Sequence, residues 1–297
     1  MTVSVLLAVH NGDRWLARAL ESVRAQTLQD WELIIVLNGC IDDSERIATA
    51  EASQDGRMHV LSTTEKGKNN AYNIAYRRAR GDVLCFFACD DVLPADSLAK
   101  RQAPIFLKGP DVFTTCRLQL ISTDRRYDGI LMPRLPEQPN FSGGCLMFSR
   151  NLAEKIFPLP TCYPNEDTWV QLHLRIFGTG FHLSEALYLY RIHDQNSFGY
   201  EIGFEEKRAR FLVRMKCYAD VYERYRRELV GASFLRDVLE PYVTGIRLCE
   251  QRRMLRIFLL PRLVWSQKFV LAGYCNAGAF WLRTVLGRFL TGRFGQG

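Results

Sequence analysis

The sequence predicts an α/β fold with a mostly parallel sheet flanked by helices. Over the first hundred residues, short apolar runs alternate with segments of helical period. This alternation is typical of parallel strands joined by crossover helices. The runs are apolar at almost every position, which indicates strands that are buried on both faces. With 297 residues, the chain has room for this sheet and for a further region after it.

The expected elements of the sheet follow one another in a regular order. Four apolar runs predict strands at 4–9, 33–37, 58–61 and 83–87. Between them, helical spacing predicts helices at 14–26, 44–52 and 70–79. The first helix shows the pattern most clearly, because Leu16, Ala19, Leu20 and Val23 place apolar side chains on one face.

After residue 98 the strand and helix signals are less regular. We expect a hairpin of 112–121 and 129–132, a strand ending at 148, a helix at 167–177, and short strands at 181–183 and 187–190. From 204 onward the chain is helical in pattern, most clearly at 204–229 and 234–254. We therefore predict an α/β domain at 1–200 and a helical C-terminal extension at 201–297.

Basic charge is concentrated at the C-terminal end. The chain has 39 Lys and Arg against 32 Asp and Glu, a net charge of +7. No Asp or Glu follows Glu250, whereas eight Lys and Arg do. The first 250 residues are therefore nearly neutral, with the other 31 basic side chains against all 32 acidic ones. The basic excess is a property of the C-terminal region.

The cysteines and the start of the chain favour a cytoplasmic protein. Nine cysteines are scattered along the sequence without zinc-ligand spacing. The chain opens with an expected strand rather than with a signal peptide. The longest uncharged stretch, 269–282, has 14 residues, and a membrane-spanning helix needs about 20 apolar ones. We predict reduced thiols and no transmembrane segment.

Two adjacent carboxylates end the fourth expected strand. The apolar run stops at Asp90 and Asp91, and Pro94 then marks a loop. Open α/β sheets bind ligands at the carboxyl ends of their strands. Paired carboxylates suit Mg²⁺ or Mn²⁺, which usually also bind substrate phosphates. The alternative is a capped helix start, with Asp91 or Asp96 as the cap.

Further motifs occur in a fixed order around this acid pair. They are the segments 3–12, 22–27 and 31–36, the residues from Gly67 to Asp82, Cys89-Asp90-Asp91, Asn165-Glu166-Asp167 and Tyr190-Arg191-Ile192-His193. In this order and spacing they resemble the inverting family 2 glycosyltransferases of the GT-A fold, from about Val3 to Ser197. In that family the acid pair belongs to the metal-binding DxD-type motif.

The resemblance implies roles for the charged motifs. The donor would be a nucleotide-diphosphate sugar, with UDP as the first candidate, and the cofactor Mn²⁺ or Mg²⁺. Asp91 would be the main metal ligand, Asp90 a ribose contact or second ligand, and His193 a further ligand or diphosphate donor. Asp167, with Glu166 beside it, would be the base of a single displacement with inversion at the sugar C1. A simpler role for Glu166 and Asp167 is to place negative charge at the N-terminus of a helix, which the helix dipole favours.

A second group of residues would line the nucleotide and sugar pockets. Ala8, His10, Asn11 and Asn38 are expected at the ends of the first two strands, beside the nucleotide. Lys68 and Asn70 would contact base or phosphate, although a solvated loop is an alternative for Lys68. Gly143 and Gly144 would let the backbone approach the donor sugar or acceptor, or would form a plain tight turn.

The chain departs from the family pattern at two positions. Leu37 stands where the family often has the first of two Asp, and Asn38 follows it. Ala88 replaces the first Asp of a full DxDD. A Leu side chain cannot hydrogen-bond a base, whereas the Asn side chain can contact base or ribose. Asp90 and Asp91 would therefore supply the acidic ligands alone.

The C-terminal extension mixes aromatic, aliphatic and basic side chains without acids. The segments 258–265 and 280–290 have the composition of an interfacial helix on anionic lipid. We predict that residues 252–297 dock the enzyme on the inner face of the cell membrane. Packing on the α/β domain or on a second copy, in a homodimer, is the alternative. No nucleic-acid partner is expected.

Three functions are compared on this basis. The leading one is a glycosyltransferase that extends a glycan or lipid-linked saccharide in cell-surface polysaccharide synthesis. A nucleotidyltransferase is disfavoured, because its Gly-rich basic loop after the first strand is replaced by His10-Asn11-Gly12-Asp13. A catalytically inactive GT-A-like binding or scaffold subunit would explain Leu37 and Ala88, but it leaves Asp90, Asp91, Asp167 and His193 without a role.

Overall fold

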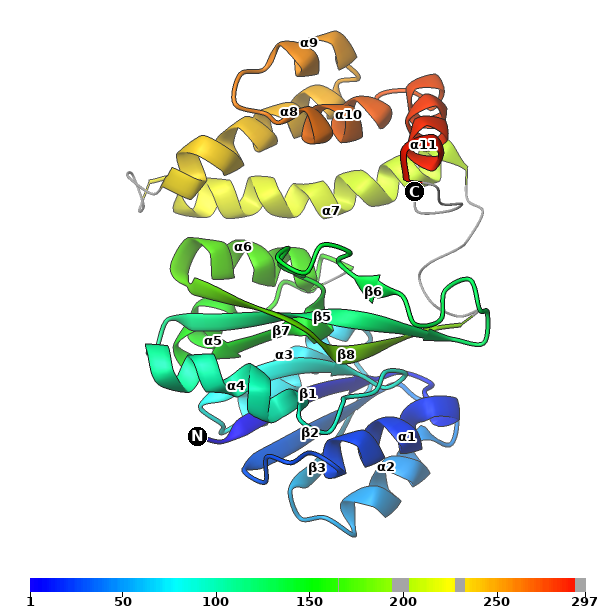
Figure 1. Ribbon diagram of the computed structural model, residues 1–297, viewed down its shortest axis with the longest axis vertical. Helices are drawn as coiled ribbons and strands as arrows, with labels where there is room; N and C mark the ends of the chain where they lie inside the picture. Colours follow the sequence, from blue (N-terminus) through cyan, green and yellow to red (C-terminus); the bar gives the residue numbers. More distant parts are fainter. Residues whose placement is uncertain (165, 194–202, 228–232, 292–297) are drawn as a thin grey trace. The chain divides into compact units, whose positions relative to one another are not determined.

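The first four strands form the parallel part of one mixed sheet (Figure 1). The computed structural model describes residues 1–164, 166–193, 203–227 and 233–291. It divides the chain into two units, Met1–His193 and Asp194–Gly297. The domain boundary expected at residue 200 lies outside the described residues, as do Asn165 and Ser197 of the sequence resemblance.

The sheet of the first unit has eight strands in the order β3-β2-β1-β4-β7-β5-β6, with β8 paired to β5. The strands are β1 (Val3–Val9), β2 (Trp31–Asn38), β3 (Met58–Thr63), β4 (Val83–Ala88), β5 (Val112–Ser122), β6 (Leu131–Met132), β7 (Leu146–Ser149) and β8 (Thr179–Ile192). Strands β1 to β4 run parallel to one another, and β8 runs parallel to β5. Strand β7 is antiparallel to both β4 and β5. The α/β fold with a mostly parallel sheet is confirmed.

Helices cover both faces of this sheet. They are α1 (Asp13–Arg24), α2 (Ser44–Ala52), α3 (Lys68–Arg78), α4 (Ser97–Lys108), α5 (Arg150–Ile156) and α6 (Asp167–Phe177). Buried side chains of α1, α2 and α4 pack into one core with alternate residues of the strands. Helix α3 packs on β1 and β2, and Tyr72 lies 4.7 Å from the ring of Phe86. Because successive side chains of a strand point to opposite faces of the sheet, the central strands are buried on both faces.

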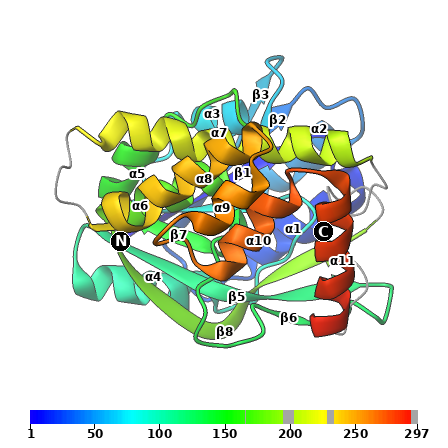
Figure 2. The same ribbon diagram turned by 90° about the horizontal axis from the view of Figure 1, so that it is seen from above.

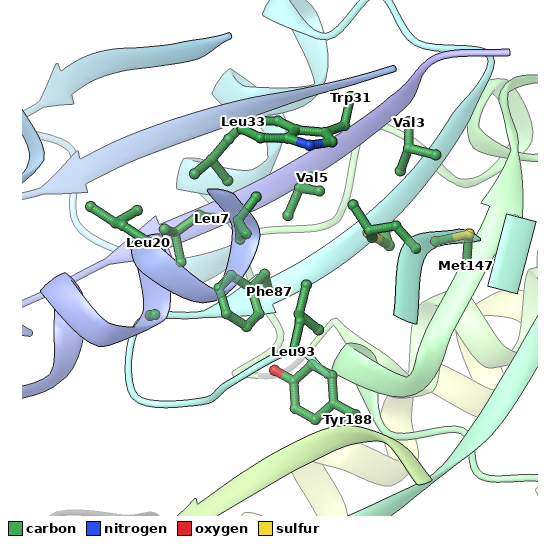
Figure 3. Packing of buried hydrophobic residues seen from close by; sticks show 14 of the residues in the cluster. Val3, Val5, Leu7, Leu20, Trp31, Leu33, Phe87, Leu93, Met147 and Tyr188 are labelled. Carbon is green, nitrogen blue, oxygen red and sulfur yellow. The ribbon is translucent and has the colours of Figure 1, made fainter. Parts of the chain in front are cut away.

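The main core explains why the central strands contain so few polar residues. Val5, Leu7, Leu33 and Phe87 point to the same side of the sheet and are almost fully buried (Figure 3). All eight residues of β2 are buried. The core extends along the chain to Tyr188 of β8. This packing fixes the ends of β1, β2 and β4 relative to one another.

The second unit is helical. Its elements are α7 (Phe204–Tyr225), a π-helical segment (Phe234–Leu239), α8 (Glu240–Glu250), α9 (Met254–Leu259), α10 (Trp265–Gly273) and α11 (Ala277–Thr291). Its small core is formed by Met215, Ile246, Cys249, Ile257, Leu263, Leu271 and Cys275 (Figure 2 shows these helices from above). In the described part of the chain, no helix combines the length and the apolar character that a membrane crossing requires.

Some expected elements differ from those in the structure. The two short strands predicted at 181–183 and 187–190 belong to one strand, β8, because the pairing with β5 continues through an irregularity beside Cys116 and Arg117. The helix expected at 234–254 is divided into the π-helical segment, α8 and the start of α9. No bounds were predicted for α4 and α5. Helix α4 begins directly after Asp96, which is its N-cap residue as in the alternative of a capped helix start, and Pro104 lies within it.

Candidate active site

The carboxyl ends of β1, β2 and β4 lie at one edge of the sheet. The register pairs Ala8 with Val36 on one side and with Ala88 on the other. The loops that follow these three strands therefore start side by side. The loops after β1 and β4 carry His10 and Asn11, and the pair Asp90 and Asp91, while Asn38 is the last residue of β2. The end of β8 reaches the same place, because Leu189 forms a bridge with Val92.

Asp91 is buried, and both of its carboxylate oxygens accept hydrogen bonds. The Tyr188 hydroxyl donates to Oδ2 at 2.7 Å, and the backbone N–H of Arg191 donates to Oδ1 at 2.8 Å. Burial and the nearby charge of Asp90 raise the pKa of Asp91 to about 8, although the two hydrogen bonds oppose the shift. Asp91 thus joins the end of β4 to the end of β8.

Asp90 faces a different environment from its neighbour. Its side chain is 26% exposed, and Oδ2 lies 3.0 Å from Nε2 of His193. The Arg191 Nε group donates to the backbone carbonyl of Asp90 at 2.8 Å and holds the turn. Asp90 is therefore the more accessible of the two carboxylates, whereas both oxygens of Asp91, the expected main metal ligand, already accept hydrogen bonds. His193, expected as a further ligand, lies beside Asp90.

The Asp90 and His193 pair is compatible with a divalent ion that shares its coordination with a substrate. In residues 1–164, 166–193, 203–227 and 233–291, no three His, Cys, Asp or Glu side chains gather into a metal site. Mg²⁺ is commonly bound by one or two carboxylates together with substrate phosphates. Imidazole nitrogen with carboxylate oxygen also suits transition metals such as Mn²⁺. The residues present therefore fit a metal whose remaining ligands are phosphate oxygens and water.

The loop after β1 is tied to the end of β2. His10 Nδ1–H donates to the Asn38 carbonyl at 2.7 Å, and Asn11 Oδ1 accepts from the N–H of Ile41 at 2.9 Å. Asn11 has a φ of 50°, a conformation that Asn tolerates better than most residues. The side-chain oxygen of Asn38 is buried and has no hydrogen-bond partner within the described chain. An unpaired acceptor of this kind suits an N–H donor on a bound base.

Gly144 is required by the packing of Tyr188. A Cβ on Gly144 would lie 2.2 Å from Cζ of Tyr188, so no larger residue fits there. The guanidinium of Arg101 donates to the Gly144 carbonyl at 3.0 Å and holds the turn. The neighbouring Gly143 packs against Glu166, because a Cβ there would lie 2.5 Å from Oε1. The turn thus positions Tyr188 and Glu166, and its expected approach to the donor sugar remains a prediction.

Lys68 joins the start of α3 to the start of α6. Its Nζ donates to Oε1 of Glu166 at 2.9 Å, although the two residues are 98 positions apart. The Lys68 side chain is 47% exposed and that of Glu166 only 5%. Burial opposes the charged form of Lys68, but the charge of Glu166 outweighs it and raises the pKa of Lys68. Asn70 donates to the carbonyl of Glu65. The expected contacts of Lys68 and Asn70 with a nucleotide stay predictions.

The second candidate catalytic pair is held at the beginning of α6. Glu166 is buried, its Oε2 has no hydrogen-bond partner in the described part of the chain, and Asp167 is half-buried. The N–H of Thr168 donates to Asp167 Oδ1 at 2.7 Å. Asn69 and Asn73 of α3 bind the carbonyls of the loop that leads to this pair. The charge of Asp167 also raises the pKa of Lys68.

The two carboxylate pairs belong to one electrostatic environment. The charge of Lys68 lowers the pKa of Asp91, although burial raises it by more. The Lys68 ammonium group also donates to Glu166. Tyr72, one helical turn after Lys68, has its pKa raised by burial and by the charges of Glu166 and Asp91. Helix α3 thus lies between the acids that follow β4 and the acids that begin α6.

An aromatic and basic group beside this edge was not expected from the sequence. The ring centroid of Trp15 lies 4.1 Å from Cζ of Arg191, 4.7 Å from Cζ of Arg14 and 6.4 Å from the His193 ring. Burial and the charge of Arg18 lower the pKa of Arg191. Clustered cations at a site for phosphates are physically reasonable. Arg14 and Trp15 lie at the start of α1, directly after the first loop, whereas Arg191 belongs to the end of β8.

Comparisons with known proteins agree with this architecture. A family model described as "Glycosyl transferase family 2" matches residues 4–157. The chain is 29% identical over 220 residues to an uncharacterized glycosyltransferase of Nostoc sp., an alignment that covers 66% of each protein. Two other bacterial relatives are matched over only 27% of their own lengths.

Solved structures share the fold at low sequence identity. The S. aureus TarS fragment 1–349 in complex with UDP-GlcNAc has a TM-score of 0.65 and 15% identity, over 100% of this chain and 93% of that one. The mannosyltransferase PcManGT from Pyrobaculum calidifontis, in complex with GDP-Man and Mn²⁺, has a TM-score of 0.58 and 15% identity. That alignment covers 95% of this chain and 86% of PcManGT. At this identity the two structures establish the GT-A fold alone.

Proposed function

Because the chain belongs to glycosyl transferase family 2, we propose that it moves a sugar from a nucleotide-diphosphate sugar to a hydroxyl group of a glycan or lipid-linked saccharide. The pairing of Asp90 with His193 at the carboxyl edge of the sheet carries this proposal. UDP is the first candidate for the nucleotide, supported by the UDP-GlcNAc complex of the neighbour TarS. GDP is the second, since PcManGT was solved with GDP-Man.

The donor end of the reaction belongs to the loops after β1, β2 and β4. Ala8, His10, Asn11 and Asn38 would line the base and ribose, and the buried Asn38 oxygen supports this role. Asp90 and His193 would hold Mn²⁺ or Mg²⁺, which neutralises developing charge on a leaving diphosphate. Asp91 would position the turn and the end of β8 through its hydrogen bond with Tyr188. Asp90 rather than Asp91 would be the main carboxylate ligand of the metal.

The acceptor end belongs to the start of α6. Asp167 would take the proton from the acceptor hydroxyl as its oxygen bonds to the sugar C1. The bond from C1 to the diphosphate oxygen breaks, and the nucleoside diphosphate leaves with the electron pair. A single displacement of this kind inverts the configuration at C1. Glu166, fixed by Lys68, would orient the acceptor beside Asp167.

The biological setting is also part of the proposal. We assign the enzyme to cell-surface polysaccharide synthesis, in the cytoplasm at the inner face of the membrane. The expected reduced cysteines and the basic C-terminal region support this location. The domain at 1–200 would carry the chemistry, and the region at 201–297 would attach the enzyme to its surroundings.

A donor screen tests this function without knowledge of the acceptor. The full chain is incubated with UDP-, GDP- and dTDP-sugars, and release of nucleoside diphosphate is measured with Mn²⁺, with Mg²⁺ and with EDTA. We expect slow metal-dependent hydrolysis of donors that share one nucleotide, with inversion at C1 visible by NMR. Retention at C1 would contradict the single displacement.

The same screen separates an enzyme from an inactive binding subunit. An inactive subunit would bind one nucleotide but would release no product with any metal or with any acceptor mixture. Leu37 is buried in the core and Ala88 ends β4, so neither position supplies an acid to the site. Binding without turnover would therefore favour the inactive subunit over the enzyme.

A further inference from the structure

Helices α9 and α10 of the second unit expose large apolar side chains. Leu255 is 76% exposed, Leu259 81%, Trp265 66% and Phe269 52%. Together with Phe258, these residues define what we name the α9–α10 surface. Leu255, Phe258 and Leu259 follow at spacings of three and four, so they lie on one side of α9. Trp265 and Phe269 lie one turn apart on α10 in the same way.

The aromatic side chains of this surface form a contacting cluster. The Phe258 centroid lies 6.3 Å from that of Trp265 and 5.6 Å from that of Phe269, and the last two are 6.2 Å apart. The Nζ of Lys268 lies 5.1 Å from the Trp265 ring centroid and donates to the Phe258 carbonyl. The exposed rings are therefore fixed in place by neighbours on both helices.

The core of the second unit uses the opposite side of these helices. Ile257 of α9 and Leu271 of α10 are fully buried, and Leu263 of the connection is nearly so. The exposed side chains are thus additional to those that the core needs. Contiguous exposed apolar patches of this kind usually mark an interaction site.

The charge around the α9–α10 surface is positive. Arg252, Arg253, Arg256, Arg262 and Lys268 lie in or beside the two helices, and no acid occurs from Gln251 to the end of the chain. Arg252 pairs with Glu205 and Arg262 approaches Asp237, both from preceding elements. Arg253 and Arg256 are exposed beside the apolar side chains.

We propose that the α9–α10 surface docks the protein on an anionic lipid bilayer, with Trp265 and Phe269 inserted at the level of the headgroups. Aromatic rings that combine with aliphatic side chains and surrounding cations suit this boundary. Each Lys or Arg near an anionic surface adds to the attraction. In this arrangement the helices lie along the membrane surface and do not cross it.

Charge decides between a membrane and a second copy of the chain. A twofold interface uses the same patch of both copies, so it would gather the arginines beside α9 of two chains in one interface, where no residue after Glu250 supplies an acid. Anionic headgroups meet the same side chains with complementary charge. The inference rests on the proposed function only in its purpose, which is to bring the site to a lipid-linked acceptor.

Vesicle flotation of the full chain tests the proposal. Vesicles of phosphatidylcholine alone are compared with vesicles that also contain phosphatidylglycerol. The double variant Trp265→Ser/Phe269→Ser removes the two rings. Phe106→Ser/Leu107→Ser on α4 is the matched control, because Phe106 and Leu107 are exposed to 66% and 72% and lie outside the surface.

We expect wild type and control to float with the anionic vesicles only. The Trp265→Ser/Phe269→Ser variant should bind the vesicles at least about tenfold more weakly, since the loss of even one inserted apolar side chain lowers the affinity by about tenfold. Equal flotation of this variant and wild type, or no flotation of wild type, would overturn the proposal. The proposal would also be overturned if wild type were a dimer, the double variant were a monomer, and neither bound vesicles.

Two readouts keep this test independent of the proposed function. Circular dichroism checks that both double variants are folded. Nucleotide binding of the same samples reports on the first unit, whereas flotation reports on the second. Vesicle binding without nucleotide binding would support the docking surface and contradict the proposed function. Nucleotide binding without vesicle binding would support the proposed function and contradict the docking surface.

Discussion

The two units of the chain place their side chains in opposite ways. The first unit buries ionisable groups, with Asp91, Glu166 and Arg101 exposed to 4% or less. The second leaves Leu255, Leu259 and Trp265 exposed. Burial of a charged group costs free energy unless the group is paired. A large apolar side chain that stays exposed does not contribute the favourable free energy of its removal from water. Each unit therefore departs from the simplest packing where we propose a function.

The difference shows how the two kinds of site are built. In the first unit, contacts between distant segments fix the acids in position, as between Tyr188 and Asp91 or Lys68 and Glu166. In the second, neighbouring helices present one surface while their other side forms the core. Changes in the first unit should therefore alter chemistry and stability, and changes on the α9–α10 surface should alter attachment alone.

The largest effect is expected at Asp167. Asp167→Asn keeps the shape of the side chain but removes the base, so turnover should fall by about 10²–10⁴-fold while nucleotide binding is retained. Steady-state kinetics and titration of the nucleotide measure the two effects. Asp96→Asn before the start of α4 is the control for helix charging, since Asp96 is partly exposed and paired with Lys100. Equal small losses in both variants would reduce Asp167 to a helix-terminal charge.

A smaller effect is expected when Lys68 is replaced. Lys68→Met leaves Glu166 buried without its ion-pair partner, and the free energy of unfolding should fall by about 1–3 kcal/mol. The value should lie near the lower end, because the Lys68 side chain is 47% exposed and the pair is partly screened. Urea unfolding measures the change, with Lys66→Met as the control at an exposed neighbour. The addition of Glu166→Gln should recover part of the loss, and its failure to do so would argue against the pair.

The smallest effect concerns the sheet rather than the site. Glu32 of β2 accepts hydrogen bonds from Ser4 and from the N–H groups of Arg80 and Gly81. Burial raises the pKa of Glu32, but these hydrogen bonds outweigh it and lower the pKa below its usual value. Its charged form therefore stabilises the fold above the ordinary pKa of a glutamate, and this contribution is lost as the pH falls through the lowered value.

Glu32→Gln keeps an acceptor oxygen and removes the charge. The variant should lose about 1 kcal/mol of unfolding free energy at pH 7, and the difference from wild type should shrink on acidification. Unfolding curves at pH 7 and near pH 4 measure both values. A gap that widens in acid would contradict the lowered pKa.

Much of the first unit could be predicted from local sequence. Apolar runs located β1 to β4 because these strands are buried on both faces. The helix at 44–52 and the helix at 167–177 have the predicted bounds. Strand β8 was predicted in two pieces, since Ser184 and Glu185 are polar and the continuous pairing with β5 is a tertiary property.

The site was less predictable than the fold. Adjacent acids look alike in a sequence, and only burial by Tyr188 and the end of β8 separates Asp91 from Asp90. The partner of Lys68 lies 98 residues away on another element, so spacing could not reveal it. Motif order named the segments that meet at this edge of the sheet, but contacts between distant elements decide which of their side chains stay accessible.

The edge around Asp90 and His193 is where we propose that the metal and the diphosphate bind. Isothermal titration of UDP and GDP with Mn²⁺ and with EDTA, for wild type, Asp90→Ala and Trp265→Ser/Phe269→Ser, tests it most directly. We predict that Mn²⁺ strengthens binding of one nucleotide in wild type and in the surface variant, and that Asp90→Ala loses this gain. An Asp90→Ala variant that binds as wild type does, with the same response to Mn²⁺, would contradict the account.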